Sequence, residues 1–317
     1  SNCPPHLSAI AKHMGVKINL NDWQKLGHDI PLLVNCKPAG EHLMERFYRS
    51  GGIPAVMQEL LKQKKLHKSV KTVSGKTLEQ NLKIKINIDT DVIKSFDDPV
   101  VDNAGFIVMK SNFFNSAVMK TSVISEEFRE RYLSNPDHPN VFEGKAVMFE
   151  GPEDYHHRIN SNKLKIDEHS ILMVRGCGPV GYPGSAEVVN MQPPDRLLKE
   201  GINALPTLGD GRQSGTSESP SILNVSPESA VGGDLAIVKT GDKIKIDLNK
   251  SRVDLLISAA EFKKRRKKKK LPKLISQTPW QEISRNTVGQ LEDGACINSR
   301  GVYLDIAKKK GIPRNSH

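Results

Sequence analysis

The sequence has no run of apolar residues that approaches the roughly 20 needed for a membrane-spanning helix. Its first residues, Ser1-Asn2-Cys3-Pro4-Pro5, lack the basic segment and the apolar stretch of a secretory signal peptide. Aromatic residues make up only 5% of the 317, so any core must be built mainly from Ile, Leu, Val and Met. We therefore expect a soluble cytoplasmic protein with no membrane partner. The length suggests about two domains.

Cysteines are few, and they are scattered. Cys3, Cys36, Cys177 and Cys296 are far apart, and the sequence has no Cys-x-x-Cys pair. This spacing argues against a zinc ribbon and against a local iron–sulfur loop. A disulfide framework is not expected in a chain of this length without a secretory signal. We interpret all four as ordinary thiols, because free cysteine is commonly a small buried residue.

Acidic residues are fewer than basic ones, 36 against 47, which leaves a formal net charge of +11. Part of the excess lies in one uninterrupted basic run, Lys263–Lys270. Such a run can bind nucleic acid or act as a nuclear address. The alternative is a solvated linker, which we favour because no aromatic residue interleaves with the run, as a stacking platform for single strands would require. Nucleic acid is therefore not an expected partner.

The residue pattern changes near residue 95. Before that point it is typical of helices; beyond it, short β-prone segments bounded by Gly, Asp or Asn predict a barrel or sandwich with a few helices. The expected helices are His6–Met14, one capped by Asn21 or Asp22, Glu41–Tyr48, one that begins near Pro54, Glu126–Leu133, one that begins at Thr278-Pro279, and Tyr303–Lys309. The expected strands are Ala104–Met109, Ala146–Phe149, Ser170–Val174, Leu235–Val238, Lys243–Leu248 and Arg252–Ile257. We divide the chain into residues 1–95, residues 96–262, and a basic linker with a helical tail at 263–317.

Two glycine-rich segments are candidates for a functional site. The first, Arg175–Glu187, follows an apolar strand and holds four glycines and two prolines, which let the backbone approach a ligand closely. Its last residue, Glu187, stands where a helix could begin and could serve as a metal ligand or as a helix cap. The second segment is Leu208–Ser217, in which Arg212 could clamp a carboxylate and Ser214 has an accessible hydroxyl. A polar surface turn is the alternative for this second segment.

A third group, Glu150–Ile159, offers carboxylates together with His156 and His157. Its spacing does not match the metal-binding helix of zinc proteases. We favour a capped helix start with exposed side chains.

These segments, in this order, resemble the family that includes dihydroxy-acid dehydratase, 6-phosphogluconate dehydratase and the sugar-acid (aldonic-acid) dehydratases. The resemblance is to the C-terminal portion of the family, and the two glycine segments look closest to the sugar-acid branch. It is carried by Ser1-Asn2 with His6-Leu7, Gly51–Met57, Phe149–Glu153, Gly178–Gly184, Gly209–Thr216, Pro227-Glu228, Thr278–Trp280 and Gly294–Cys296.

The resemblance implies a fold of class α/β plus β. Residues 1–95 would be the remainder of a parallel-sheet α/β domain, and a β-barrel-like domain flanked by helices would follow. It also implies a hydro-lyase that converts a 2,3-dihydroxy carboxylate or sugar acid to a 2-keto acid. A small polyhydroxy acid would be the substrate, and a dimer or tetramer is expected.

The resemblance further implies two cofactors. An iron–sulfur cluster would act as a Lewis acid on the leaving 3-hydroxyl, and Mg²⁺ would hold the carboxylate and the 2-hydroxyl. Glu187 matches a magnesium ligand and Ser214 matches the catalytic base, with Arg212, Ser214 and Thr216 as substrate-binding residues. None of the four cysteines falls in the family's cluster motifs, so no cluster ligand is expected in this chain.

Three interpretations stay open from the sequence. The first is a dehydratase whose remaining ligands lie outside these residues, because the chain is a piece of a longer protein or a truncated gene product. The second is an inactive remnant or binding module with the same fold. The third is a nucleic-acid-associated protein that uses Lys263–Lys270.

Overall fold

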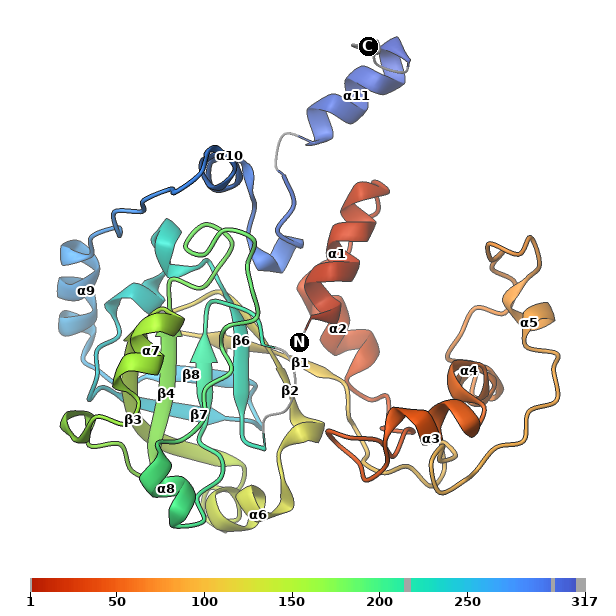
Figure 1. Ribbon diagram of the computed structural model, residues 1–317, viewed down its shortest axis with the longest axis horizontal. Coiled ribbons are helices and arrows are strands. Elements are labelled where there is room, and N and C mark those ends of the chain that lie inside the picture. The colour runs from red at the N-terminus through yellow and green to blue at the C-terminus, as the bar shows by residue number, and fades with distance from the viewer. Residues whose placement is uncertain (1, 214–217, 298–299, 312–317) are drawn as a thin grey trace. The chain divides into compact units, whose positions relative to one another are not determined.

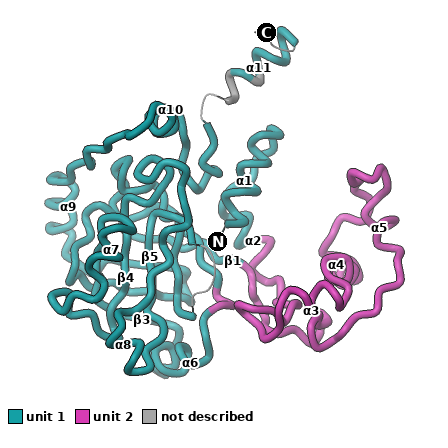
Figure 2. Tube along the Cα trace, in the orientation of Figure 1, with its two compact units in different colours: residues 1–25, 106–120, 124–317 teal, residues 26–105, 121–123 magenta. Residues whose placement is uncertain are grey.

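The computed structural model describes residues 2–213, 218–297 and 300–311. The chain divides into two compact units (Figure 2). One contains residues 1–25, 106–120 and 124–317, and the other contains residues 26–105 with 121–123. No helix among the described residues is both long and apolar enough to cross a membrane.

The larger unit is built on a closed barrel of eight strands (Figure 1). Around the barrel the order is β1-β2-β6-β5-β4-β3-β7-β8. The strands are β1 (Phe106–Ser111), β2 (Ser116–Lys120), β3 (Val141–Glu150), β4 (Ser170–Arg175), β5 (Thr207–Gly209), β6 (Ser221–Ser226), β7 (Lys243–Asp247) and β8 (Arg252–Leu255). The strands β3, β4, β5 and β6 pair in parallel with one another. The antiparallel pairs are β1–β2, β2–β6, β3–β7 and β7–β8, while β8 closes the barrel parallel to β1.

Both faces of the parallel strands are buried. On β4, Ile171 and Met173 belong to a core cluster that also holds Met109 and Met119 from β1 and β2. The alternate residues Leu172 and Val174 belong to a second cluster. Strands covered on both faces are apolar throughout, which is why the Ser170–Val174 run was recognisable in the sequence.

Helices flank the barrel, and the smaller unit contains α3 (Met44–Arg49), α4 (Gly52–Lys62) and α5 (Leu78–Asn81). Earlier in the chain are α1 (Cys3–His13) and α2 (Leu20–Gly27). Later helices are α6 (Glu126–Phe128), which continues as a π-helical turn η2 (Arg129–Leu133), then α7 (Pro152–Arg158), α8 (Asp195–Lys199), α9 (Ala259–Lys268), α10 (Pro279–Thr287) and α11 (Arg300–Lys310). The short 3₁₀ turns are η1 (Thr121–Val123), η3 (Asn162–Leu164), η4 (Ser229–Val231), η5 (Asp234–Ile237) and η6 (Leu291–Asp293).

The barrel and its flanking helices confirm the second part of the predicted fold class. The parallel sheet expected in residues 1–95 is not confirmed, because residues 2–95 contain helices and isolated bridges but no extended strand. The predicted helix start at Thr278-Pro279 is confirmed: the Thr278 hydroxyl accepts a hydrogen bond from Gln281 N–H, and Pro279 takes the first helical position.

One predicted strand is wrong. The apolar segment Leu235–Val238 falls mostly within the 3₁₀ turn η5, and Leu235 and Ile237 pack into the barrel core from this turn. Gly232, at φ +97°, turns the chain just before it. A run of four apolar residues indicates that the segment is buried. It is too short to show whether the segment is a strand or a helical turn.

The run Lys263–Lys270 is helical as far as Lys268 and so is not a linker there, although most of its side chains are exposed as expected. Residues 263–268 form the second half of α9, which Ser258 caps by accepting a hydrogen bond from Glu261 N–H. Lysine and arginine are good helix formers, and Arg265 binds the carboxylates of Asp242 and Glu261. These contacts hold a helix in place where composition alone suggested only solvation.

The barrel core generates a stability prediction. Leu208 on β5 is 0% exposed within the main core cluster. We expect Leu208→Ala to lower the free energy of unfolding by about 2–5 kcal/mol, because a cavity would remain in a closed barrel. Urea unfolding measures the change. The control is Leu198→Ala on α8, where the side chain is 37% exposed, with an expected cost below about 1 kcal/mol. Equal costs at the two positions would contradict the packing described above.

Candidate active site

Four parallel strands end at the same edge of the barrel. In the register of the sheet, Glu150 of β3 pairs with Arg175 of β4, and Val174 pairs with Gly209 of β5. The carboxyl ends of parallel strands meet at one edge, so the segments that follow them are neighbours. These segments are Gly151-Pro152 after β3, the first glycine segment after β4, the second glycine segment after β5, and Pro227-Glu228 after β6.

Asp210 fastens the two glycine segments to each other. Its side chain is completely buried, and its carboxylate accepts hydrogen bonds from the backbone N–H of Gly176 (3.1 Å), Cys177 (2.8 Å) and Ser229 (2.9 Å). A Cβ at position 211 would lie 2.6 Å from Cys177 Cβ, so this close approach requires Gly211. Buried carboxylates are tolerated when hydrogen bonds satisfy them. We therefore assign Asp210 a positioning role.

Glu228 fills the concave side of the first glycine segment. Its carboxylate accepts hydrogen bonds from the backbone N–H of Val180 (2.9 Å) and Gly181 (2.8 Å) and from Gln290 Nε2 (2.8 Å). A Cβ at Gly178 would lie 2.5 Å from the carboxyl carbon, so the backbone can wrap around Glu228 only with glycine there. Burial raises the pKa of Glu228, although the hydrogen bonds act in the opposite direction.

Arg212 brings both glycine segments and the N-terminal segment together. Its Nε donates to the backbone oxygen of Ser185 (2.7 Å), and its Nη1 lies 3.3 Å from Asn2 Oδ1 and 3.2 Å from His6 Nε2. The same Nη1 is 3.8 Å from Glu187 Oε1, which also accepts a hydrogen bond from Asn2 Nδ2. We call these five residues the Arg212 site. It gathers a guanidinium, a carboxylate, an amide and an imidazole, which are groups suited to binding an anionic, hydroxyl-bearing ligand.

Two of the four predicted site residues thus lie in one place. Glu187 and Arg212, whose side chains are 30% and 17% exposed, meet in the Arg212 site. The other two, Ser214 and Thr216, lie outside the described residues, so their roles stay predictions.

The expected helix start at Glu187 is wrong. No helix begins there, because the following backbone bonds across to the other segment: the N–H of Val189 donates to the carbonyl of Arg212 at 3.0 Å.

The remaining candidate groups behave as ordinary structural features. The group Glu150–Ile159 contains the whole of α7, with His156 and His157 exposed and Arg158 paired with Asp154. This confirms the expected helix start and the exposed histidines, but no side chain caps the helix, since Gly151 stands at the cap position.

Among the described residues, no three His, Cys, Asp or Glu side chains are placed to hold a metal ion together. Cys36, Cys177 and Cys296 are buried, and burial raises the pKa of the Cys36 and Cys177 thiols, which disfavours the thiolate that a metal needs. Cys3 differs, because it is exposed and directly follows Asn2 of the Arg212 site.

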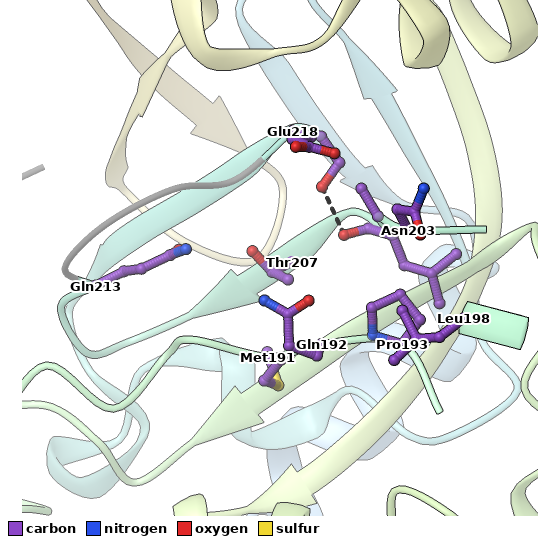
Figure 3. A pocket seen from close by; sticks show the side chains of 11 residues that line it. Met191, Gln192, Pro193, Leu198, Asn203, Thr207, Gln213 and Glu218 are labelled. Carbon is purple, nitrogen blue, oxygen red and sulfur yellow. Dashed lines mark hydrogen bonds between the residues drawn. The ribbon is translucent and has the colours of Figure 1, made fainter. Parts of the chain in front are cut away.

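A separate polar pocket of about 240 Å³ lies beside the second glycine segment (Figure 3). Gln192 and Thr207 point toward each other within it, and Asn203 and Glu218 lie along its wall. Gln213 also lines it and accepts a hydrogen bond from Ser221 Oγ at 2.5 Å. None of the residues that line this pocket belongs to the Arg212 site.

Sequence reasoning named Asn2, His6, Asp210 and Glu228 only as parts of motifs and gave them no role. For Asp210 the available signal was an acidic residue between two glycines, whereas Glu228 stands between Pro227 and Ser229 and gave no comparable signal. For Asn2 and His6 no local pattern could show that they lie against a segment about 200 residues away.

Comparisons with known proteins match most of the chain to one enzyme family. A family model described as dihydroxy-acid/6-phosphogluconate dehydratase C-terminal matches residues 91–295, and the corresponding N-terminal model matches residues 1–81. The D-xylonate dehydratase of Caulobacter vibrioides is 53% identical over 318 residues, which cover 100% of this chain and 53% of the relative.

More distant relatives include the L-arabinonate dehydratase of Rhizobium leguminosarum bv. trifolii, 40% identical over 266 residues (84% of this chain, 44% of the relative). The dihydroxy-acid dehydratase of Ignicoccus hospitalis is 33% identical over 267 residues (84% of this chain, 46% of the relative). The chain spans about half the length of the curated relatives it matches.

The raised pKa of Glu228 generates a pH prediction. The folded state favours the protonated carboxyl group, so the stability that Glu228 contributes is fully present below its ordinary pKa of 4.5 and is lost as pH rises through the higher folded-state pKa. We expect the free energy of unfolding of the wild type, relative to Glu228→Gln, to fall between pH 4.5 and neutral pH. Urea unfolding across this range measures it. Glu200→Gln, at an exposed carboxylate, is the control, and a pH-independent difference at position 228 would refute the assignment.

Proposed function

The chain belongs to the dihydroxy-acid/6-phosphogluconate dehydratase family. From this premise we propose that it forms part of a hydro-lyase. This enzyme would convert a sugar acid, or another 2,3-dihydroxy carboxylate, to a 2-keto acid. The two most similar relatives reported above are dehydratases of D-xylonate and L-arabinonate, which favours the sugar-acid branch. Both names describe those proteins, and each acid is a proposed substrate here.

The observation that supports this proposal is the meeting of Glu187 and Arg212 from the two glycine segments, with Asn2 and His6 beside them. A sugar acid carries a carboxylate next to a hydroxyl. Arg212 supplies positive charge for the carboxylate, and the amide and imidazole can exchange hydrogen bonds with hydroxyl groups. The guanidinium, amide and imidazole groups of this site therefore match the carboxylate and hydroxyl groups of a sugar acid.

The reaction removes the proton at C2 and the hydroxyl group at C3, and the resulting enol becomes the 2-keto acid. We propose Ser214, two positions after Arg212, as the base that takes the C2 proton. A serine hydroxyl has too high a pKa to act unaided, so it must be held as an alkoxide by nearby positive charge. Arg212 supplies a positive charge in the same segment. We also propose Thr216 as a further hydrogen-bonding group for the substrate.

The residues present fit Mg²⁺ through one ligand. Glu187 offers a half-buried carboxylate, and Mg²⁺ is commonly bound by one or two carboxylates with waters and substrate oxygens. When bound there, Mg²⁺ would hold the substrate carboxylate and 2-hydroxyl and so acidify the C2 proton. Glu187 would orient the ion, and its hydrogen bond from Asn2 would orient Glu187.

The thiols do not fit an iron–sulfur cluster, because no metal-binding group of three side chains occurs among the described residues and the cysteines are therefore not gathered around one point. We therefore assign no residue to the departure of the 3-hydroxyl. Cys3 is the one exposed thiol next to the Arg212 site.

Four further expectations stay proposals. They are the domain boundaries near residues 95 and 262, a homo-oligomeric state, a cytoplasmic location, and a chain that forms part of a longer enzyme.

Glu187→Gln tests the magnesium site. We expect it to weaken Mg²⁺ binding at least roughly tenfold, because the neutral amide is a poorer ligand for a hard cation. Isothermal titration of Mg²⁺ into the whole chain measures the affinity. Glu153→Gln, which removes an exposed carboxylate on α7, is the control and should leave the affinity unchanged. Equal affinity in the wild type and in Glu187→Gln would remove Glu187 from this role.

Ser214→Ala tests the base. In a preparation that contains this chain and dehydrates D-xylonate or L-arabinonate, we expect 2-keto acid formation to fall by about 10²- to 10⁴-fold, with Mg²⁺ affinity retained. The matched control is Ser217→Ala, which removes a hydroxyl from the same segment. Near-normal turnover in Ser214→Ala would exclude Ser214 as the base. An acid that binds but is never converted by the wild type would favour the inactive binding module.

A further inference from the structure

The basic helix α9 is fastened to the barrel unit by a few of its cationic residues. Arg265 Nη1 lies 2.5 Å from Asp242 Oδ2, and its Nε lies 2.8 Å from Glu261 Oε1. These partners raise the pKa of Arg265, whose side chain is only 13% exposed. Lys269 Nζ lies 2.8 Å from Asp234 Oδ1 and also donates to the carbonyl of Gly232. The helix therefore has a defined orientation, with one side committed to internal partners.

The lysines on the other side of α9 have few partners within the protein. Lys263, Lys264, Lys267 and Lys268 are exposed and occupy two rows at i and i+4 on α9. Within the described part of the chain, only Lys264 of these four has a carboxylate within 4.0 Å, at 3.6 Å from Glu261. We call these four residues the α9 lysine face. Three of its four ammonium groups have no carboxylate within 4.0 Å among the described residues, in a chain whose net charge is already +11.

Hollows on both sides of α9 extend this face. One, of about 540 Å³, is lined by Lys263 and Lys267, by Arg266, which is already paired with Asp234, and by Asn112 and apolar residues. The other, of about 490 Å³, adds Lys239 and Lys270 to Lys264 and Lys268. The acidic group in this second hollow, Glu261, already binds Arg265. A polyanion laid across the helix would thus meet cationic groups on either side of it.

We propose that the α9 lysine face binds the phosphodiester backbone of nucleic acid without sequence preference, as a property separate from the dehydratase site. Residues 263–268 extend about 7.5 Å along a helix axis, at 1.5 Å per residue. A duplex carries one negative charge per about 1.7 Å when both strands are counted, so this length of duplex holds about four phosphates on its two strands, and the face provides four lysines to reach them. The lysine ammonium is a point charge without the planar fork of arginine, so attraction to the phosphates dominates the contact that we propose.

An anionic membrane surface fits this helix less well. Helices that bind membranes carry an apolar face that enters the lipid beside the basic face. On α9 the large apolar residue is Phe262, and it packs against the barrel core. The exposed side of the helix carries lysines and two alanines, and no large apolar side chain that could enter lipid. Binding to phosphates in solution requires no more than that.

Fluorescence anisotropy of the whole chain with a labelled 20-base-pair DNA duplex of arbitrary sequence tests the proposal. With four phosphates contacted, log K should fall against log[salt] with a slope of about −3.6, so affinity drops on the order of 100-fold between 50 and 200 mM salt. The variant Lys263→Gln/Lys264→Gln/Lys267→Gln/Lys268→Gln should make this slope shallower by about 3 to 4. A second duplex of unrelated sequence should bind equally well.

Matched variants decide whether position or total charge matters. Replacing Lys145, Lys163, Lys199 and Lys243 with Gln removes the same charge from exposed sites elsewhere and should leave the slope unchanged. Replacing the α9 lysine face with Arg should retain binding, and circular dichroism checks that all variants fold. The proposal is overturned if the control variant loses as much binding as the α9 variant. It is equally overturned if phosphatidylserine vesicles bind in an α9-dependent way while the duplex does not.

Discussion

The buried carboxylate of Asp210 is the interaction on which the site depends. Parallel pairing of β3 to β6 brings four loops to one edge of the barrel, but pairing alone leaves each loop free to point away. Asp210 removes that freedom by accepting three backbone hydrogen bonds, two from the first glycine segment and one from Ser229 beyond β6. Because the carboxylate is shielded from water, losing any of these bonds would leave a buried charge poorly satisfied. The loops are therefore held in one arrangement.

Within that arrangement, the glycines allow close approach of the backbone, and the charged side chains join the segments to one another. Gly178 and Gly211 allow backbone and side chains to approach to distances that a Cβ would prevent. Glu228 then fills the space inside the first segment, while Arg212 reaches across to Ser185 and to the N-terminal segment. The result is a carboxylate, Glu187, held next to a cation in a partly exposed position. This pair is where we propose that the metal ion and the anionic ligand bind.

The basic residues of α9 also fall into two groups, one paired with carboxylates and one exposed to solvent. Arg265 and Lys269 are neutralised by carboxylates of the barrel unit and determine where the helix lies, whereas the α9 lysine face is left to solvent. Composition could not separate these groups, because neighbouring cationic residues in one run look equivalent. Only the positions of Asp234 and Asp242 make them different.

The sequence by itself predicted a β-rich unit that could be a barrel or a sandwich, most of its strands, the start of α10, and the two segments that form the site. These features rest on local signals: alternating or continuous apolar residues, capping residues, and glycines after a strand. It misplaced Leu235–Val238 and Glu187, and it missed β2, β5 and β6. Tertiary structure alone decided that Asn2 and His6 meet Arg212, and that Asp210 and Glu228 hold the loops. Those contacts join residues far apart in the chain, and their energy depends on burial and on partners that no local pattern records.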